Sequence, residues 1–199
     1  MVRLAGERSM LTIAWDVDDV LNNLMGEWLT KKWLPEHPGC RITFAEIKQN
    51  PPEVILGCSR AEYEASLDEF RLSTLYPAML PDKDVLAWFK KNGSRARHLA
   101  LTAVPLKAAH ISAAWVLKYF GSWIRTFSFV PSVRLGEEVV LYDRSKAGYL
   151  KWLDRVDVLV EDSEPNINAV RAIGLPGFLV NKPWNKGGVP LKEALAKIL

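Results

Sequence analysis

The chain has 199 residues, of which 49% are hydrophobic and 25% are charged, and its formal net charge is +3. This composition is typical of one globular core with an insertion, and it leaves little room for two full domains. The lysines and arginines are scattered rather than gathered on one face, so we do not expect a nucleic-acid polymer as a partner. No apolar run reaches membrane-spanning length, and the start MVRLAGERS lacks the apolar core of a signal peptide. We therefore expect a cytoplasmic protein that binds no membrane.

The first predicted strand ends in a group of carboxylates. Residues 10–24 read MLTIAWDVDDVLNNL, an apolar run of strand character followed directly by acids. Side chains two apart on an extended chain point the same way, so Asp16 and Asp18 can address one site. Two close carboxylates repel each other and call for a cation, and ligands that are all oxygen suit Mg²⁺. The alternative is a solvated acidic turn after a core strand.

The rest of the chain divides into a helical stretch and a region where strands and helices alternate. Helices are predicted at residues 22–34, 43–49 and 59–70, and nothing between residues 21 and 76 has the pattern of a strand. Further on, strands are predicted at residues 98–102, 126–130, 156–160 and 177–181, and helices at 81–91, 106–120, 146–153, 164–173 and 190–198. This alternation implies a parallel sheet with helices on both faces. We predict an α/β protein with a Rossmann-like three-layer core (residues 1–20 and 77–199) and a small helical cap (residues 21–76) inserted after the first strand.

Several common catalytic motifs are missing. Cys40 and Cys58 are the only cysteines and form no CxxC pair, which indicates reduced thiols rather than a disulfide framework. The three histidines have no zinc-site spacing. The sequence contains no GxGxxG, no P-loop and no GxSxG motif, which argues against dinucleotide-binding, P-loop and α/β-hydrolase functions.

A second predicted strand also ends in carboxylates. Residues 156–160 run into Glu161 and Asp162. Because the carboxyl ends of parallel strands meet at one edge of a sheet, where ligands bind, we expect these acids to lie near Asp16.

The sequence DVDDV after an apolar strand resembles the first motif of the haloacid dehalogenase superfamily, most of whose members are Mg²⁺-dependent phosphatases. The resemblance implies that Asp16 is the nucleophile that becomes an aspartyl phosphate and that Asp18 is the general acid and base. It also implies that Mg²⁺ is bound by Asp16, by the backbone carbonyl of Asp18 and by Asp162. Glu161 is then either an alternate ligand or a residue that contacts the ligands without binding the metal. The Glu-Asp pair departs from the Asp-Asp form that is commoner in the superfamily.

Thr102 and Lys146 complete the implied phosphate site. Thr102 is predicted to end the strand at residues 98–102, where its hydroxyl and the next backbone N–H form an anion clamp, and it matches the second motif of the superfamily. A helix cap is the alternative. Lys146, in YDRSK, resembles the third motif of the 5′(3′)-deoxyribonucleotidases and would act as a point charge on the phosphate and the nucleophile. A solvated lysine is the alternative here, and Lys107 and Lys151 are rival candidates.

The order DVDDV, LTA, Lys, EDS matches the superfamily, and the helical insertion, KYFG and NKPWN are similar to its nucleotidase-like branch. The implied function is a Mg²⁺-dependent phosphomonoester hydrolase with a small phosphorylated substrate, a nucleotide being the expected class. Aromatic residues of the cap would either stack a base or form the cap's own core: Trp28, Trp33, Phe44, Tyr63, Phe70 and Tyr76. The alternatives are a phosphatase of another small phosphometabolite and a catalytically idle binding module of the same fold. A homodimer is left open.

Overall fold

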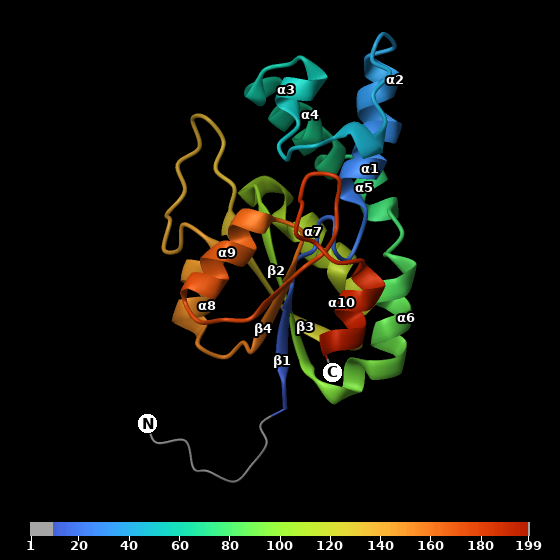
Figure 1. The fold of residues 1–199 in the computed structure, drawn as a ribbon. Coiled ribbons are helices and arrows are strands. Elements are labelled where there is room, and N and C mark those ends of the chain that lie inside the picture. The colour runs from blue at the N-terminus through green and yellow to red at the C-terminus, as the bar shows by residue number, and fades with distance from the viewer. Residues whose placement is uncertain (1–9, 199) are drawn as a thin grey trace.

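A computed structural model describes residues 10–198, and a five-stranded sheet lies at its centre (Figure 1). The strands are β1 (Thr12–Trp15), β2 (Arg97–Val104), β3 (Ile124–Pro131), β4 (Val158–Glu161) and β5 (Gly177–Leu179). All strand pairs are parallel, and the order is β3-β2-β1-β4-β5. A strand is found in each of the five predicted places. β1 lies in the middle of the sheet, between β2 and β4.

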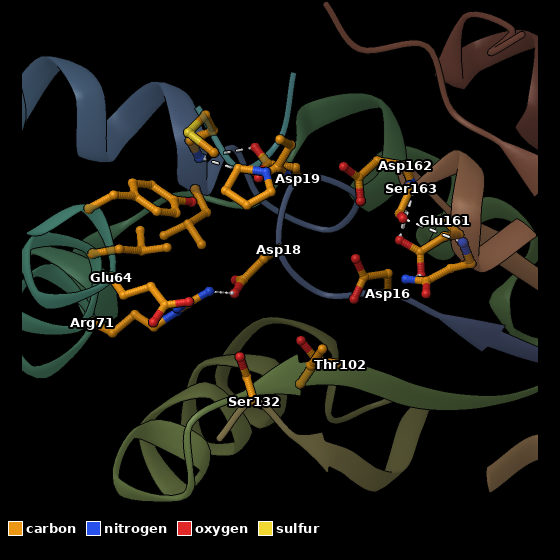
Figure 2. Close-up of a pocket in the computed structure, with 18 of the residues that line it drawn as sticks. Asp16, Asp18, Asp19, Glu64, Arg71, Thr102, Ser132, Glu161, Asp162 and Ser163 are labelled. Carbon is orange, nitrogen blue, oxygen red and sulfur yellow. Dashed lines mark hydrogen bonds and ion pairs between the residues drawn. The ribbon is translucent and has the colours of Figure 1, made fainter. Parts of the chain in front are cut away.

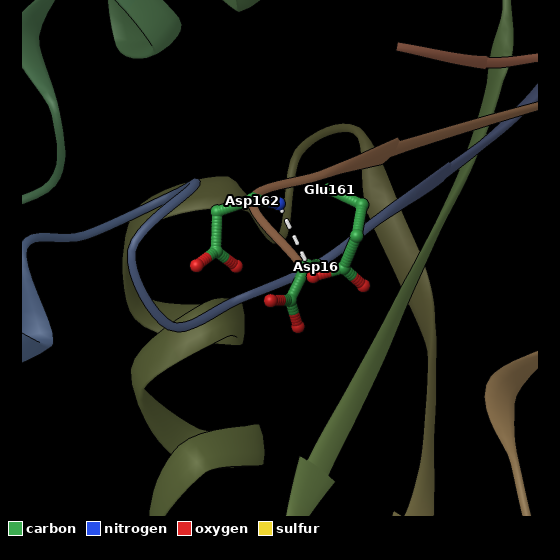
Figure 3. A group of neighbouring side chains, drawn as sticks. All are labelled: Asp16, Glu161 and Asp162. Atoms are coloured by element: carbon green, nitrogen blue, oxygen red, sulfur yellow. Dashed lines mark hydrogen bonds between the residues drawn. The ribbon is translucent and has the colours of Figure 1, made fainter. Parts of the chain in front are cut away.

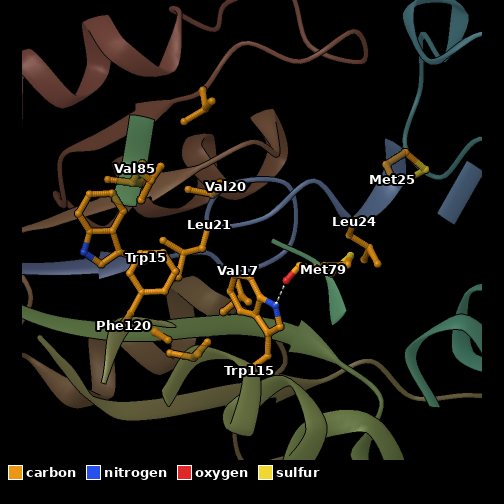
Figure 4. Packing of buried hydrophobic residues seen from close by; sticks show 14 of the residues in the cluster. Trp15, Val17, Val20, Leu21, Leu24, Met25, Met79, Val85, Trp115 and Phe120 are labelled. Atoms are coloured by element: carbon orange, nitrogen blue, oxygen red, sulfur yellow. Dashed lines mark hydrogen bonds between the residues drawn. The ribbon is translucent and has the colours of Figure 1, made fainter. Parts of the chain in front are cut away.

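Side chains of the central strand alternate between two apolar layers. Ile13 and Trp15 face a layer that contains α6 (Lys83–Asn92), α7 (Leu106–Phe120) and α10 (Leu191–Ile198). Ala14 faces the opposite layer, which contains α8 (Lys146–Leu153) and α9 (Glu164–Ala172). Figure 4 shows Trp15 packed among residues of the first layer. Both faces of the sheet are buried, as parallel sheets require, and the predicted three-layer α/β architecture is confirmed.

The helices between β1 and α6 lie together beyond the carboxyl ends of the strands (Figure 1). They are α1 (Leu24–Trp28), the π-helical turn η1 (Leu29–Trp33), α2 (Leu34–Glu36), the 3-10 turn η2 (Phe44–Glu46), α3 (Glu53–Leu56), α4 (Arg60–Leu72) and α5 (Leu75–Ala78). Another 3-10 turn, η3 (Gly93–Arg95), precedes β2. The short helices α3 and α5 were not predicted, and the predicted boundary at residue 76 falls inside α5. We call residues 21–76 the cap.

Local sequence explains where two of the helices begin. Ser59 accepts a hydrogen bond from the backbone N–H of Glu62 at the start of α4, and Ser145 accepts one from Gly148 at the start of α8. Serine is a preferred N-cap residue, because its side chain satisfies backbone donors that the first helical turn leaves free. The cap at Ser145 places Lys146 in the first turn of α8.

Most of the cap's aromatic side chains are buried in the hydrophobic core. Trp28, Trp33, Phe70 and Tyr76 are buried in the same hydrophobic cluster as Trp15 of the sheet. The cap and the α6–α7–α10 side of the sheet therefore share one continuous apolar core.

Among residues 10–198, no helix is both long and apolar enough to cross a membrane.

Candidate active site

Asp16 directly follows β1, and only 6% of its surface is exposed. Its backbone N–H donates to the carbonyl oxygen of Val160 at 2.9 Å, which carries the β1–β4 pairing one residue past the end of β1. Its Oδ1 lies 2.6 Å from Nζ of Lys146. Burial, together with the negative charge of Glu161, raises the pKa of Asp16 to about 8 against the opposing effect of Lys146. Additional positive charge at this site would favour the ionised form of this carboxylate.

Lys146 is buried between two carboxylates. Its Nζ lies 2.6 Å from Oδ1 of Asp16 and 2.6 Å from Oε2 of Glu161. Burial alone lowers the pKa of Lys146, but the two carboxylates raise it above its ordinary value, so the ammonium is charged. The two rival lysines lie elsewhere. Lys107 pairs with Asp68 of the cap at 3.2 Å, and Lys151 is exposed.

Glu161 ends β4 and is fully buried, with both carboxylate oxygens engaged. Oε2 accepts hydrogen bonds from Lys146 at 2.6 Å and from Nδ2 of Asn166 at 3.3 Å. Oε1 accepts from the backbone N–H groups of Asp162 and Ser163, each at 3.1 Å. Burial alone would raise the pKa of Glu161, but Lys146 holds it below its ordinary value. The carboxylate of Glu161 therefore binds Lys146 and the backbone N–H groups that directly follow β4.

Asp162 completes a cluster of three acids at the adjoining ends of β1 and β4. Asp16, Glu161 and Asp162 each offer one oxygen, and these oxygens lie within 4.8 Å of one another (Figure 3). Burial, with the charges of Glu161 and Asp16, raises the pKa of Asp162 well above its ordinary value. Lys146 alone does not balance this negative charge. The set of donors is all oxygen and partly unneutralised, which fits a hard divalent cation such as Mg²⁺.

Asp18 lines the same cavity as Asp16 but is hydrogen-bonded to the cap (Figure 2). Its Oδ1 accepts from Oη of Tyr76 at 2.8 Å, and its Oδ2 accepts from Nη2 of Arg71 at 3.0 Å. β1 ends before Asp16, and the chain turns at Asp19, whose φ is 64°. The two acids therefore reach one cavity through a turn, and not through the two-residue period of a strand on which the sequence argument relied.

The turn after Asp18 has its own polar support. Asp19 donates its backbone N–H to Oδ1 of Asn22 at 3.1 Å, and its carboxylate accepts from the backbone N–H of Met25 at 3.0 Å. A short acidic side chain tolerates positive φ better than most residues do, and here it also caps α1. Burial raises the pKa of Asp19 to about 6, with Lys182 opposing the shift.

Thr102 lies inside β2 and not at its end as predicted. The pairing of β2 with β3 continues to Val104, because β3 is long enough to extend the ladder by two more residues. β2 therefore runs two residues past Thr102, while α7 begins at Leu106 as predicted, so Pro105 alone separates the strand from the helix. Thr102 is buried and lines the same cavity as Ser132 (Figure 2).

The cavity has a volume of about 350 Å³ and is bounded by the carboxyl ends of the strands and by the cap. Its cap side carries mixed polar, charged and apolar residues: Leu24, Met25, Asn50, Pro51, Arg60, Tyr63, Glu64, Leu67 and Arg71. Of the six aromatic residues proposed from sequence to stack a base, all within the described chain, Tyr63 alone lines this cavity.

An ion-pair network joins the cap to the core next to the cavity. Arg134, after β3, donates from Nε and Nη2 to the two oxygens of Asp68 at 2.8 and 2.7 Å. Nη1 of Arg71 lies 3.6 Å from the same carboxylate. Burial alone would raise the pKa of Asp68, but Arg134 lowers it below its ordinary value. The sequence analysis did not identify Arg71, Asp68 or Arg134 as site residues. Arg71 pairs with Asp18, and Arg134 pairs with Asp68, across more than fifty positions, so no local sequence pattern marks these contacts.

Comparison with known proteins adds to this geometry. No family model matches the sequence, and no curated protein matches it. Solved structures match it over nearly its whole length. A haloacid dehalogenase-like family hydrolase from Streptococcus pneumoniae has a TM-score of 0.63 and 11% identity, covering 94% of this chain and 90% of its own. The chain has the haloacid dehalogenase-like fold.

Two further structures share this haloacid dehalogenase-like fold. A protein named as a β-phosphoglucomutase from Thermotoga maritima has a TM-score of 0.57 and 17% identity, covering 96% of this chain and 100% of its own. A protein named as a phosphoglycolate phosphatase from Lactobacillus delbrueckii has a TM-score of 0.58 and 14% identity, covering 96% and 98%. The fold predicted from DVDDV and the strand pattern is therefore confirmed.

Proposed function

We propose that this protein is a Mg²⁺-dependent phosphomonoester hydrolase that acts through an aspartyl phosphate on Asp16. The observation that carries the proposal is the buried contact of Asp16 with Lys146, next to Asp162 at the adjoining ends of β1 and β4. A carboxylate attacks a phosphate ester only where positive charge screens their mutual repulsion. Asp16, Asp162 and the backbone carbonyl of Asp18 would hold Mg²⁺, which when bound would supply that screening.

The proposed reaction has two steps, each carried by residues of the cavity. An oxygen of Asp16 attacks phosphorus, the ester P–O bond breaks, and the leaving oxygen takes a proton from Asp18. A water molecule then attacks phosphorus, gives its proton to Asp18 and releases phosphate, which regenerates Asp16. Lys146 neutralises charge on Asp16 and the phosphate, and Thr102 donates its hydroxyl to a phosphate oxygen.

The substrate we propose is a small phosphate ester. A nucleotide is the class that the sequence resemblance implied, and Tyr63 would be its stacking ring. A cavity of about 350 Å³ with this single aromatic residue on its cap side favours the second candidate, another small phosphometabolite with a polar leaving group. An idle binding module would not need both Asp16 and Asp18 together with a buried Lys146.

A panel of phosphate monoesters tests the proposal. Nucleotides, sugar phosphates and phosphoglycolate are assayed with Mg²⁺ and with EDTA, and we expect phosphate release only with Mg²⁺. Asp16→Asn removes the attacking oxygen, so its turnover should be undetectable. Asp84→Asn changes an exposed acid on α6 and serves as the control with parental activity. Full activity of the parent in EDTA would contradict the proposed metal.

The intermediate can be trapped in the Asp18→Asn variant. This variant keeps the nucleophile but loses the proton donor and the base, an effect of about 10²–10⁴ in rate. With a good leaving group such as p-nitrophenol, the first step needs little protonation, so the variant should accumulate a hydroxylamine-sensitive acyl phosphate. Peptide mapping after rapid quench should locate the label on Asp16. A label on Asp18 would show that the two roles are reversed.

A further inference from the structure

Trp184 lies in the segment between β5 and α10, which rises toward the helices of the cap in Figure 1. Its indole Nε1 donates to Oδ2 of Asp162 at 2.8 Å. The next residue, Asn185, donates from Nδ2 to the backbone carbonyl of Asp162 and to that of Val180, both at 2.8 Å. Two consecutive residues of this segment therefore hold both the carbonyl and the carboxylate of one proposed metal ligand.

The segment that carries Trp184 is itself anchored to the sheet. Asn181 donates its backbone N–H to the carbonyl of Val189 at 2.8 Å, and Val189 donates to Leu179 at 3.0 Å. Gly188 packs so closely that a Cβ there would lie 2.5 Å from Cα of Asn181. The loop is thus closed on the end of β5, which gives the indole a defined position.

The neighbouring carboxylates of Glu161 and Asp162 are hydrogen-bonded by a charged and an uncharged donor, respectively. Glu161 is bound by the ammonium of Lys146, which neutralises it, whereas Asp162 is bound by an indole. An indole N–H donates a hydrogen bond but carries no charge and accepts none. It orients one oxygen of Asp162 while leaving the full negative charge and the other oxygen for a cation.

We propose that Trp184 is a positioning residue that orients Asp162 for the divalent cation of this site. The inference rests on the proposed function, since it needs a metal at Asp16 and Asp162. Groups that orient metal ligands in this way typically change metal affinity by roughly 10- to 100-fold when they are removed. The ring of Trp184 also meets Phe44 of the cap edge to face, with centroids 5.8 Å apart, so the ring and the N–H must be tested separately.

Mn²⁺ binding to the full chain, followed by the electron paramagnetic resonance signal of the free ion, measures this role without an activity assay. We expect Trp184→Phe to raise the dissociation constant for Mn²⁺ by roughly 10- to 100-fold. Trp152→Phe is the matched control, because Trp152 is 71% exposed on α8 and should bind as the parent does. Circular dichroism of each variant reports whether the fold is kept.

If Trp184→Phe does not fold, a second substitution tests the indole N–H of Trp184 separately from its ring. Replacing Trp184 with benzothienylalanine keeps the bicyclic shape and the contact with Phe44 but removes the donor, and it should weaken Mn²⁺ binding by a similar factor. Parental affinity in either folded variant would overturn the role of Trp184 and leave the proposed function intact. A parent protein that binds no Mn²⁺ would overturn the metal-dependent function and this inference with it.

Discussion

Arg71 of the cap donates from Nη2 to Oδ2 of Asp18 at 3.0 Å, and both side chains are about nine-tenths buried. This ion pair connects α4 to the turn that follows β1, and Arg71 also approaches Asp68 at 3.6 Å. The proposed acid–base residue is therefore positioned by the cap, although it belongs to the same sequence motif as the proposed nucleophile.

The Arg71–Asp18 pair should be coupled in a double-mutant cycle. Arg71→Met leaves Asp18 buried without its charged partner, so we expect the free energy of unfolding to fall by about 3 kcal/mol. In Arg71→Met/Asp18→Asn the unpaired charge is absent, and the loss should be clearly smaller than the sum of the two single losses. Urea unfolding in EDTA measures all four proteins. Arg60→Met, at an exposed pair with Glu64, should cost less than about 1 kcal/mol. Strict additivity would show that the contact contributes nothing.

Lys146 should be needed for both stability and activity, by different routes. Lys146→Met leaves Asp16 and Glu161 buried together without a cation, which we expect to cost about 3–5 kcal/mol in the free energy of unfolding. Adding Glu161→Gln removes one of those charges and should recover part of the stability. It should not recover phosphate release, since the ammonium beside Asp16 is still missing. Thermal unfolding and a phosphatase assay on both variants separate the two effects, and recovered activity in the double variant would remove Lys146 from the proposed mechanism.

Tyr63 and Trp28 should respond differently to substitution, although the sequence made both candidates for binding a base. Tyr63 lines the cavity, so Tyr63→Leu should change the ranking of nucleotides against non-aromatic phosphates. Trp28 is fully buried, and its Nε1 donates to Oγ of Ser66 at 3.1 Å. Trp28→Ala should cost about 3–5 kcal/mol of stability, and the milder Trp28→Phe should leave the ranking unchanged. Relative kcat/KM values across the panel decide this, and an unchanged ranking in Tyr63→Leu would assign that ring to packing alone.

His98 should make stability depend on pH. Its Nδ1 accepts from Nε1 of Trp15 at 3.1 Å and its Nε2 lies 2.8 Å from the carbonyl of Gly93, so the neutral ring satisfies both contacts. Burial lowers the pKa of His98 below its ordinary 6.5. Since the unfolded chain then binds a proton first, stability is lost as pH falls through about 6.5, by at most about 1.4 kcal/mol per pH unit. Buried Asp16 and Asp19 titrate in the same range in every variant, so urea midpoints at several pH values are compared between proteins: the parent should lose stability toward low pH more steeply than His98→Gln by this amount, and exposed His110→Gln should follow the parent.

Local sequence determined most of the helices and strands and the placing of acids at the ends of two strands. The apolar runs of β1 and β4 and the serine caps at Ser59 and Ser145 depend on a few neighbouring residues, so each could be predicted from the sequence. The acids after both strands were also visible, because a parallel sheet brings the carboxyl ends of its strands to one edge. The extent of β2 past Thr102 was not, since it depends on the length of its partner β3.

Tertiary structure decided which charged groups meet. The β1–β4 pairing sets Asp16 beside Asp162, and only this adjacency distinguishes Lys146 from Lys107 and Lys151. Contacts such as Arg71 with Asp18, or Trp184 with Asp162, join positions 53 and 22 residues apart. No local pattern encodes them, because an ion pair or hydrogen bond of this kind depends on where the cap and the last loop pack, and packing is a property of the whole chain.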